Sequence, residues 1–210
     1  DYFDRSPTLE AHLQSTGKLD LLDSVLDAAR MAEVVCVRQG EALGLGHAVL
    51  TARPAVAEEP FAVLLGDDII DAQRPAIEQL ISARTGTEDA VVALMEVPLQ
   101  DTGRYGVCAG PWLDPQRMRV ETMVEKPRPE DAPGRHAIVG RYVLPPEVFT
   151  ILERTPRGAG GEIQLTDAIA ELAAARRVAG LVFEGQRFDT GNVLGLIRAS
   201  LHYAMKRPEL

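Results

Sequence analysis

The stretch FAVLLGDDIID, residues 61–71, decides the fold class. Five apolar residues, a length typical of a buried strand, lead into Gly66 and then into two adjacent carboxylates, Asp67 and Asp68. In open α/β sheets, ligands bind beyond the carboxyl ends of the strands, where these aspartates are expected. An aspartate there either supplies a hard oxygen ligand for Mg²⁺ or caps the next turn, and this stretch alone does not choose between the two.

Apolar runs typical of strands alternate with amphipathic patterns typical of helices along the rest of the chain. This alternation predicts an α/β fold with a mixed, mostly parallel central sheet flanked by helices. No clean linker or repeat interrupts it, so residues 1–210 are predicted to form a single domain. Strands are expected at 34–40, 61–68, 89–97, 136–144 and 178–185, with short strands within 104–127, and helices at 9–13, 19–31, 44–52, 74–84, 145–155, 160–177 and 192–207.

The overall charge argues against two classes of partner. The 210 residues carry a formal net charge of -9, which disfavours binding to a nucleic-acid polymer or an anionic membrane. No stretch approaches the roughly 18 apolar residues of a membrane span. Two cysteines are too few for a disulfide framework. Both Cys36 and Cys108 are therefore expected to be buried thiols in a cytoplasmic protein.

A second charged pair follows another expected strand, in MVEKPRPE (123–130). Glu125 and Lys126 stand immediately before Pro127, and the chain has only two other lysines. A lysine at a strand end is a compact positive charge suited to a phosphate, and an adjacent glutamate can accept hydrogen bonds from hydroxyl groups. The alternative is an exposed charge pair before a turn. The following loop, 127–135, is interpreted as a flap over a site.

Two further segments can supply ligand contacts. In FDTGN (188–192), Asp189 either provides a second metal carboxylate or belongs to a helix N-cap, which Thr190 or Asn192 can serve equally well. In VRQGEALGLGHAVL (37–50), the glycines allow the backbone to approach a flat or anionic ligand. Gln39 offers both a donor and an acceptor for the edge of a base. His47 is expected to pack on a helix or face the surface.

Seven segments occur in the order found in one enzyme family: RQGEALGLGHAVL, FAVLLGDDIID, RYGV, VEKP, IVGRYVL, GAGGEIQLTDAI and FDTGN. Over nearly its whole length the chain resembles the bacterial UTP–glucose-1-phosphate uridylyltransferases. EIQLTDAI and GLGHAVL favour this family over the glucose-1-phosphate thymidylyltransferases. The resemblance implies a Rossmann-like nucleotide-diphospho-sugar transferase fold. It also implies Mg²⁺-dependent formation of UDP-glucose and pyrophosphate from UTP and glucose 1-phosphate, by a homodimer or homotetramer.

The resemblance assigns the metal and the phosphate contacts. Asp67 and Asp189 are implied to hold Mg²⁺, and Asp68 to shape the turn beside them. Lys126 is implied to hold the sugar phosphate. Lys126 and Asp67 are thus the implied catalytic residues.

The resemblance also assigns the contacts to the two organic parts of the ligand. Gln39 and the backbone at Gly44 are implied to contact uracil. Glu125 and Glu162 are implied to read the glucose hydroxyls. The remaining contacts to the sugar are implied at Gly106, Val139 and Gly140.

One part of the family pattern has no counterpart in residues 1–210. The family opens with a Gly-rich loop of GxGTR type and a KEMLP-type lysine, which grip the triphosphate. We therefore expect that residues 1–210 alone do not catalyse the reaction, although the full protein does. Two alternatives stay open: a noncatalytic nucleotide-sugar-binding module, and a related thymidylyl- or cytidylyltransferase.

Overall fold

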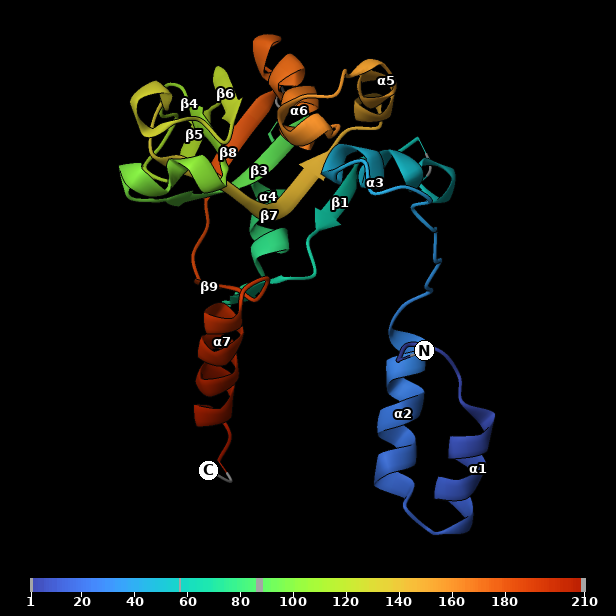
Figure 1. Ribbon diagram of the computed structural model, residues 1–210. Helices are drawn as coiled ribbons and strands as arrows, with labels where there is room; N and C mark the ends of the chain where they lie inside the picture. Colours follow the sequence, from blue (N-terminus) through green and yellow to red (C-terminus); the bar gives the residue numbers. More distant parts are fainter. Residues whose placement is uncertain (1, 57, 86–88, 209–210) are drawn as a thin grey trace. The chain divides into compact units, whose positions relative to one another are not determined.

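The computed structural model describes residues 2–56, 58–85 and 89–208. The chain divides into two compact units, residues 1–38 and residues 39–210, and each is described by itself (Figure 1). The prediction of a single domain over 1–210 stays a prediction.

The first unit is a helical hairpin. α1 (Pro7–Ser15) and α2 (Leu19–Met31) pack together, with Leu13 and Ala28 buried, so both predicted helices are confirmed. Gly17 has a φ of 71° in the connecting turn, a conformation that glycine adopts without strain. The amide of Lys18 then donates to the carbonyl of Leu13 at 3.0 Å, which satisfies a carbonyl at the end of the first helix.

The strand predicted at 34–40 is wrong. Residues 32–39 are assigned to no strand, and Val35 and Cys36 are exposed. A strand exists only where a neighbour pairs with its N–H and C=O groups, and among the described residues this segment has no strand neighbour. The prediction that Cys36 is buried is wrong for the same reason. Cys108, in contrast, is buried as predicted, and burial raises the pKa of its thiol to about 12.

The second unit is built on a seven-stranded mixed sheet. The strands follow the order β5-β8-β3-β7-β4-β6, and β1 also pairs with β7. Their bounds are β1 (Phe61–Leu64), β3 (Ala90–Glu96), β4 (Gly106–Ala109), β5 (Arg117–Arg119), β6 (Thr122–Glu125), β7 (His136–Leu144) and β8 (Val178–Val182).

The predicted mixed α/β architecture with flanking helices is confirmed, but the sheet is not mostly parallel. Among the described strands, β3 and β8 form the only parallel pair, and every other pairing is antiparallel. Continuous apolar runs report burial on both faces of a sheet, which is common in parallel sheets but not confined to them. β7 is buried along most of its length and still runs antiparallel to β1, β3 and β4.

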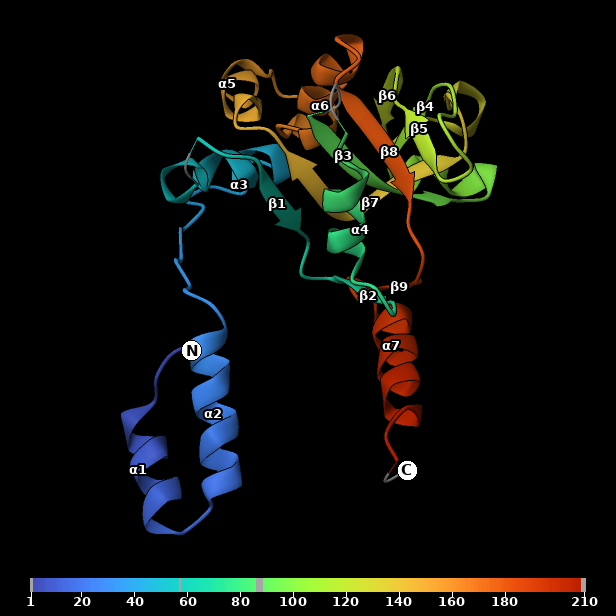
Figure 2. The ribbon, with the colours of Figure 1, turned by 180° about the vertical axis from the view of Figure 1, so that it is seen from behind.

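Helices cover both faces of this sheet (Figures 1 and 2). Side chains along β3 alternate between two cores: Val92 and Leu94 pack on one face, and Val91 and Ala93 on the other. Full burial of each aliphatic side chain stabilises the fold by about 1.5–3 kcal/mol. α3 (Leu45–Thr51), α5 (Glu147–Arg154) and α6 (Leu165–Ala174) contribute to the first core, and α4 (Ala76–Ala83) to the second.

One edge of β7 is shared by two strands that leave a gap between them. β1 pairs with residues 141–144 and β4 with residues 136–137, while β3 occupies the opposite edge. Residues 138–140 therefore lack a described strand partner on this edge. The backbone there is available to loops and ligands.

A two-stranded sheet and the last helix complete this unit. β2 (Asp68–Asp71) pairs antiparallel with β9 (Gln186–Asp189), and α7 (Val193–Met205) packs on β9 (Figure 1). The Phe188 ring lies 4.8 Å from the His202 ring, and Asp71 accepts hydrogen bonds from His202 and Lys206. The 3₁₀ turns are η1 (Arg53–Ala55), η2 (Leu99–Arg104), η3 (Pro129–Asp131) and η4 (Ala159–Gly161).

The other predicted helices are confirmed with adjusted ends. The one predicted over 160–177 begins only at Leu165, so Glu162 lies in the preceding loop. None of the helices in the described part of the chain combines the length and apolar character needed to cross a membrane.

Candidate active site

A pocket of about 230 Å³ opens at the gap beside β7. Its floor is the backbone of residues 138–140, which pairs with no described strand on this edge. Its walls come from the segment after β1, the start of β4, the end of β6, the start of α6 and the end of β9. The lining residues are Leu45, Leu65, Asp67, Asp68, Arg104, Tyr105, Gly106, Glu125, Ile138, Val139, Gly140, Tyr142, Gln164, Leu165, Thr166, Arg187 and Asp189.

Two carboxylates predicted from separate segments converge at this pocket. A Cβ atom placed on Gly191 would lie 2.8 Å from Asp67 Oδ2 and 3.2 Å from Asp189 Oδ1. The two oxygens therefore flank the same point in space. Thr190 fixes this approach, because its amide and its hydroxyl donate to the Asp67 carbonyl at 2.7 and 2.9 Å.

The capping interpretation fails for Asp189. Asn192 is the N-cap of α7, and its side chain accepts from the Gly195 amide at 2.9 Å. Asp189 Oδ1 instead accepts from the Gly191 amide at 3.1 Å, and Oδ2 lies 3.8 Å from Arg104. Within the described residues, the Asp67 carboxylate has no hydrogen-bond or ion-pair partner. The Asp67 carboxylate is thus open to a ligand, whereas Asp189 would bind one alongside its contacts with Gly191 and Arg104.

Metal chemistry at this point must rely on few protein ligands. No group of three or more His, Cys, Asp or Glu side chains with metal-binding geometry occurs in the described part of the chain. Two carboxylates are still a fitting donor set for Mg²⁺, which is usually held by one or two carboxylates together with substrate phosphates. Asp67 and Asp189 fit that pattern.

Glu125 ends β6 on another side of the pocket, and Lys126 follows it directly. The Glu125 side chain is 13% exposed and faces Gly106, where an added Cβ would lie 3.1 Å from Glu125 Oε2. Lys126 has a φ of 45°, uncommon for a residue with a side chain, and its amide donates to the Tyr105 carbonyl at 2.9 Å. Such outliers persist where surrounding structure enforces them, often at functional sites. Lys126 Nζ lies 3.7 Å from Glu125 Oε1, and half of the Lys126 side chain is exposed.

Asp68 anchors the floor of the pocket. Asp68 Oδ2 accepts from the Gly140 amide at 2.6 Å, and Oδ1 accepts from Arg187 Nε at 2.6 Å. Burial lowers the pKa of Arg187 and the charge of Asp68 raises it, with a net rise. Burial, together with Glu125 and Asp68, raises the pKa of the Tyr142 hydroxyl.

A second group of predicted residues gathers around the Gly-rich loop. Gly44 has a φ of 98°, and a Cβ there would lie 2.7 Å from Glu162 Cβ. Gln39 Nε2 lies 3.2 Å from the Gly44 carbonyl oxygen and 2.9 Å from His47 Nδ1. A carbonyl oxygen can only accept, so the amide nitrogen must face it. The two amide hydrogens of Gln39 are then donated to Gly44 and His47. The side-chain oxygen, Oε1, is left to accept a hydrogen bond from a ligand.

The structure thus separates the predicted residues into two sets. Asp67, Asp189 and four of the five sugar-contact candidates, Gly106, Glu125, Val139 and Gly140, line one pocket, with Lys126 next to Glu125. Gln39, Gly44 and Glu162 do not line it. Sequence reasoning missed the buried charge pair of Asp68 and Arg187, and it missed Arg104. One signal was available in the sequence for Arg187. It stands two residues before Asp189, and alternate residues of a strand point to the same face.

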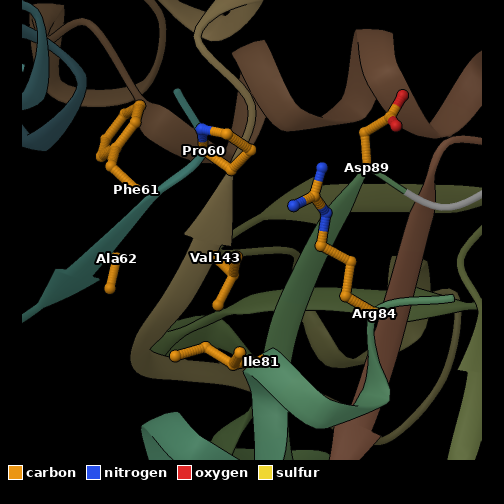
Figure 3. A pocket seen from close by; sticks show the side chains of 7 residues that line it. All are labelled: Pro60, Phe61, Ala62, Ile81, Arg84, Asp89 and Val143. Carbon is orange, nitrogen blue, oxygen red and sulfur yellow. The ribbon is translucent and has the colours of Figure 1, made fainter. Parts of the chain in front are cut away.

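Pocket size alone does not identify this site. A larger pocket of about 410 Å³ lies between β1 and α4, and Figure 3 shows Arg84 extending into it. Phe61, Ile81 and Val143 are apolar, and Asp89 is already paired with Arg177. None of the predicted site residues lines that pocket.

Comparisons with known proteins identify the family to which the chain belongs. Residues 4–206 match the family model described as nucleotidyl transferase. A UTP–glucose-1-phosphate uridylyltransferase of Staphylococcus epidermidis is 46% identical over 210 residues, covering 100% of this chain and 73% of the relative. One of Bacillus subtilis is also 46% identical, covering 100% and 72%. A crystal structure of UDP-glucose pyrophosphorylase complexed with UDP-glucose matches 99% of this chain and 76% of its own, with 39% identity and a TM-score of 0.87.

Proposed function

Because the chain belongs to the nucleotidyl transferase family, we propose that it transfers the uridylyl group of UTP to glucose 1-phosphate, forming UDP-glucose and pyrophosphate. The observation that carries this proposal is the convergence of Asp67 and Asp189 at a pocket that also presents Glu125. The relatives named above and the structure that holds UDP-glucose support the same substrates.

The sugar phosphate occupies the pocket beside β7 in this proposal. Glu125 accepts hydrogen bonds from glucose hydroxyls, and Lys126 places its ammonium group against the phosphate. Val139 and Gly140 form the floor, and Gly106 keeps the wall free of a side chain. Glu162 lies in the loop before α6, beside Gly44, and is proposed as a second acceptor for the glucose hydroxyls although it does not line this pocket.

The uracil base is read by Gln39 and the backbone at Gly44. The contacts of Gln39 leave its side-chain oxygen to accept a hydrogen bond. Uracil carries an N3–H donor, whereas cytosine has a lone pair at that position. An acceptor at Gln39 therefore favours uracil over cytosine.

Asp67 and Asp189 would hold Mg²⁺ between the nucleotide and the sugar phosphate. Bound there, the ion supplies neutralisation of the charge on the phosphate oxygens. Lys126, next to Glu125, adds a second positive charge. The pairing of β2 with β9 and the contacts of Thr190 with the Asp67 carbonyl already hold the two carboxylates near each other, so little reorganisation is needed on binding.

The reaction needs positioning more than acid–base chemistry. A phosphate oxygen of glucose 1-phosphate attacks the α-phosphorus of UTP in line, and a P–O bond forms as the bond to pyrophosphate breaks. A phosphate monoester is already anionic and nucleophilic near neutral pH, so no general base is required. The residues assigned above to the sugar phosphate, the base and the cation therefore act by binding and orienting the two reactants.

An assay of pyrophosphate release from UTP and glucose 1-phosphate tests this function. The full-length protein should release pyrophosphate in the presence of Mg²⁺, and chelation with EDTA should stop it. Release at least tenfold faster with UTP than with dTTP or CTP supports the proposal. Faster release with dTTP or CTP would instead identify a thymidylyl- or cytidylyltransferase. Binding of UDP-glucose without any release would identify a noncatalytic module.

We also propose that the protein self-associates through α7 as a dimer or tetramer. Ala199 is the helix's one buried residue, while Leu194, Ile197 and Leu201 are each more than half exposed and recur at helical spacing. Sedimentation should give a mass above that of a monomer, and I197E/L201E should reduce it. A parent protein that sediments as a monomer would contradict this proposal.

A further inference from the structure

The buried charge pair formed by Asp68 and Arg187 has no direct role in the reaction proposed above. Asp68 is 5% exposed and the Arg187 side chain 11% exposed. Both oxygens of Asp68 have protein donors, at 2.6 Å from the Gly140 amide and at 2.6 and 2.5 Å from two nitrogens of Arg187. Asp68 is thus saturated by the protein, unlike its neighbour Asp67.

The pair links three separate parts of the pocket. Asp68 follows Asp67 directly, Gly140 lies on the floor, and Arg187 stands two residues before Asp189 on β9. Asp68 and Asp189 are register partners, so Arg187 is the diagonal neighbour of Asp68 on the same face of this small sheet. Any shift of β9 along β2 would therefore separate the charge pair and the two carboxylates together.

Further contacts hold the pair in one arrangement. The Arg141 guanidinium donates to the backbone carbonyls of Asp68, Gly140 and Leu65 at 2.5, 2.8 and 3.2 Å. The Arg187 guanidinium lies 5.6 Å from the centre of the Tyr105 ring. A Cβ on Gly140 would lie 2.6 Å from Asp68 Oδ2, so the backbone approaches the carboxylate as closely as glycine permits.

We propose that Asp68 and Arg187 are positioning residues that hold the Asp67 and Asp189 carboxylates at the separation needed to share one divalent cation. This inference rests on the proposed function, because it assigns the cation to those two carboxylates. Asp68 touches neither reactant in this account. It acts through the turn that carries Asp67 and, by way of Arg187, through the strand that carries Asp189. Arg187 also offsets the charge of a third carboxylate beside two that must attract a cation.

The test measures Mn²⁺ binding by electron paramagnetic resonance in the presence of saturating UDP-glucose. Loss of a contact that orients a metal ligand typically weakens metal affinity by about 10- to 100-fold. We expect that range for D68N, at a temperature at which circular dichroism shows the variant folded. R187K keeps the positive charge but loses the paired geometry, so a smaller weakening in the same direction is expected. It also serves as the test if D68N does not fold.

A matched control separates positioning from general stability. D89N removes one of the two carboxylates that pair with Arg177, in another partly buried ion pair away from the pocket. It should lower the melting temperature and leave the Mn²⁺ affinity unchanged. Unchanged Mn²⁺ affinity in folded D68N or R187K would overturn the inference while the proposed function stands. A parent protein that binds no UDP-glucose would overturn both the inference and the proposed function. A parent protein that binds UDP-glucose but does not bind Mn²⁺ would overturn the metal assignment and, with it, this inference.

Discussion

One methyl group at Gly191 should disable the metal site without unfolding the protein. Gly191 is exposed, and its φ lies outside the left-handed region, so alanine fits its backbone without strain. The new Cβ would, however, lie 2.8 Å from Asp67 Oδ2 and 3.2 Å from Asp189 Oδ1. The substitution therefore inserts an apolar group at the point where the two carboxylates meet.

The size of the effect follows from these distances. An ordinary contact with a Cβ begins at 3.4 Å, so the Asp67 oxygen must retreat by about 0.6 Å. Metal ligands tolerate displacements of about 0.2 Å. At least one carboxylate should then be lost as a ligand, with a weakening of about tenfold or more, or about 1.4 kcal/mol. The free energy of unfolding should rise by about 0.4–1 kcal/mol, because alanine restricts the unfolded chain more than glycine does.

The assay is a Mn²⁺ titration with saturating UDP-glucose, combined with urea unfolding. G66A is the matched control, since Gly66 adjoins Asp67 but an added Cβ meets nothing within 4 Å. We expect G66A to bind Mn²⁺ like the parent protein. Parental Mn²⁺ affinity in G191A would refute the convergence of the two carboxylates on one cation.

Three further predictions address other parts of the account. K126A should weaken UDP-glucose binding by about tenfold or more through loss of a charge-assisted contact, with R128A as a control in the same loop; equal affinities for K126A and the parent in calorimetry would count against it. Q39E should weaken UDP binding more than glucose 1-phosphate binding. Its carboxylate oxygen would replace the amide nitrogen that now lies 3.2 Å from the Gly44 carbonyl oxygen, and two oxygens would face each other. Equal losses for the two ligands would argue against a contact between Gln39 and the base. Burial raises the pKa of Cys108 to about 12, so its thiol stays neutral in the folded protein while the unfolded chain ionises above its ordinary value of 9.0. Stability should then fall by about 1.4 kcal/mol per pH unit above that value, as urea melts against pH can check, and the same slope in C108A would refute the assignment.

The sequence predicted the order of elements well, because their patterns are local. Apolar runs and helical spacing identified the strands from β1 to β8 that form the buried sheet, and the helices that cover it. Direction of strand pairing is not a local property, so the antiparallel setting of β7 could not be read from its own residues. The strand expected at 34–40 failed for a related reason: β-branched residues favour a strand but do not supply its neighbour.

The candidate site was predictable where a residue's role depends on its position at a strand end. Asp67, Glu125 and Asp189 were found in this way, and the structure brings them to one pocket. Asp68 was interpreted as a residue that shapes a turn, whereas it forms a buried charge pair with Arg187, 119 positions away. A single sequence offers no measure of such long-range pairing. The choice between capping and ligand binding at Asp189 likewise required the position of Asn192.

Calorimetric titration with UDP-glucose tests the central claim most directly. UDP-glucose and CDP-glucose should be titrated separately, each with and without Mg²⁺. We predict Mg²⁺-dependent binding that is selective for UDP-glucose, because Gln39 offers an acceptor to the N3–H group of uracil and the two carboxylates share the cation. Equal affinity for CDP-glucose, or no binding of UDP-glucose by the full-length protein, would contradict this prediction.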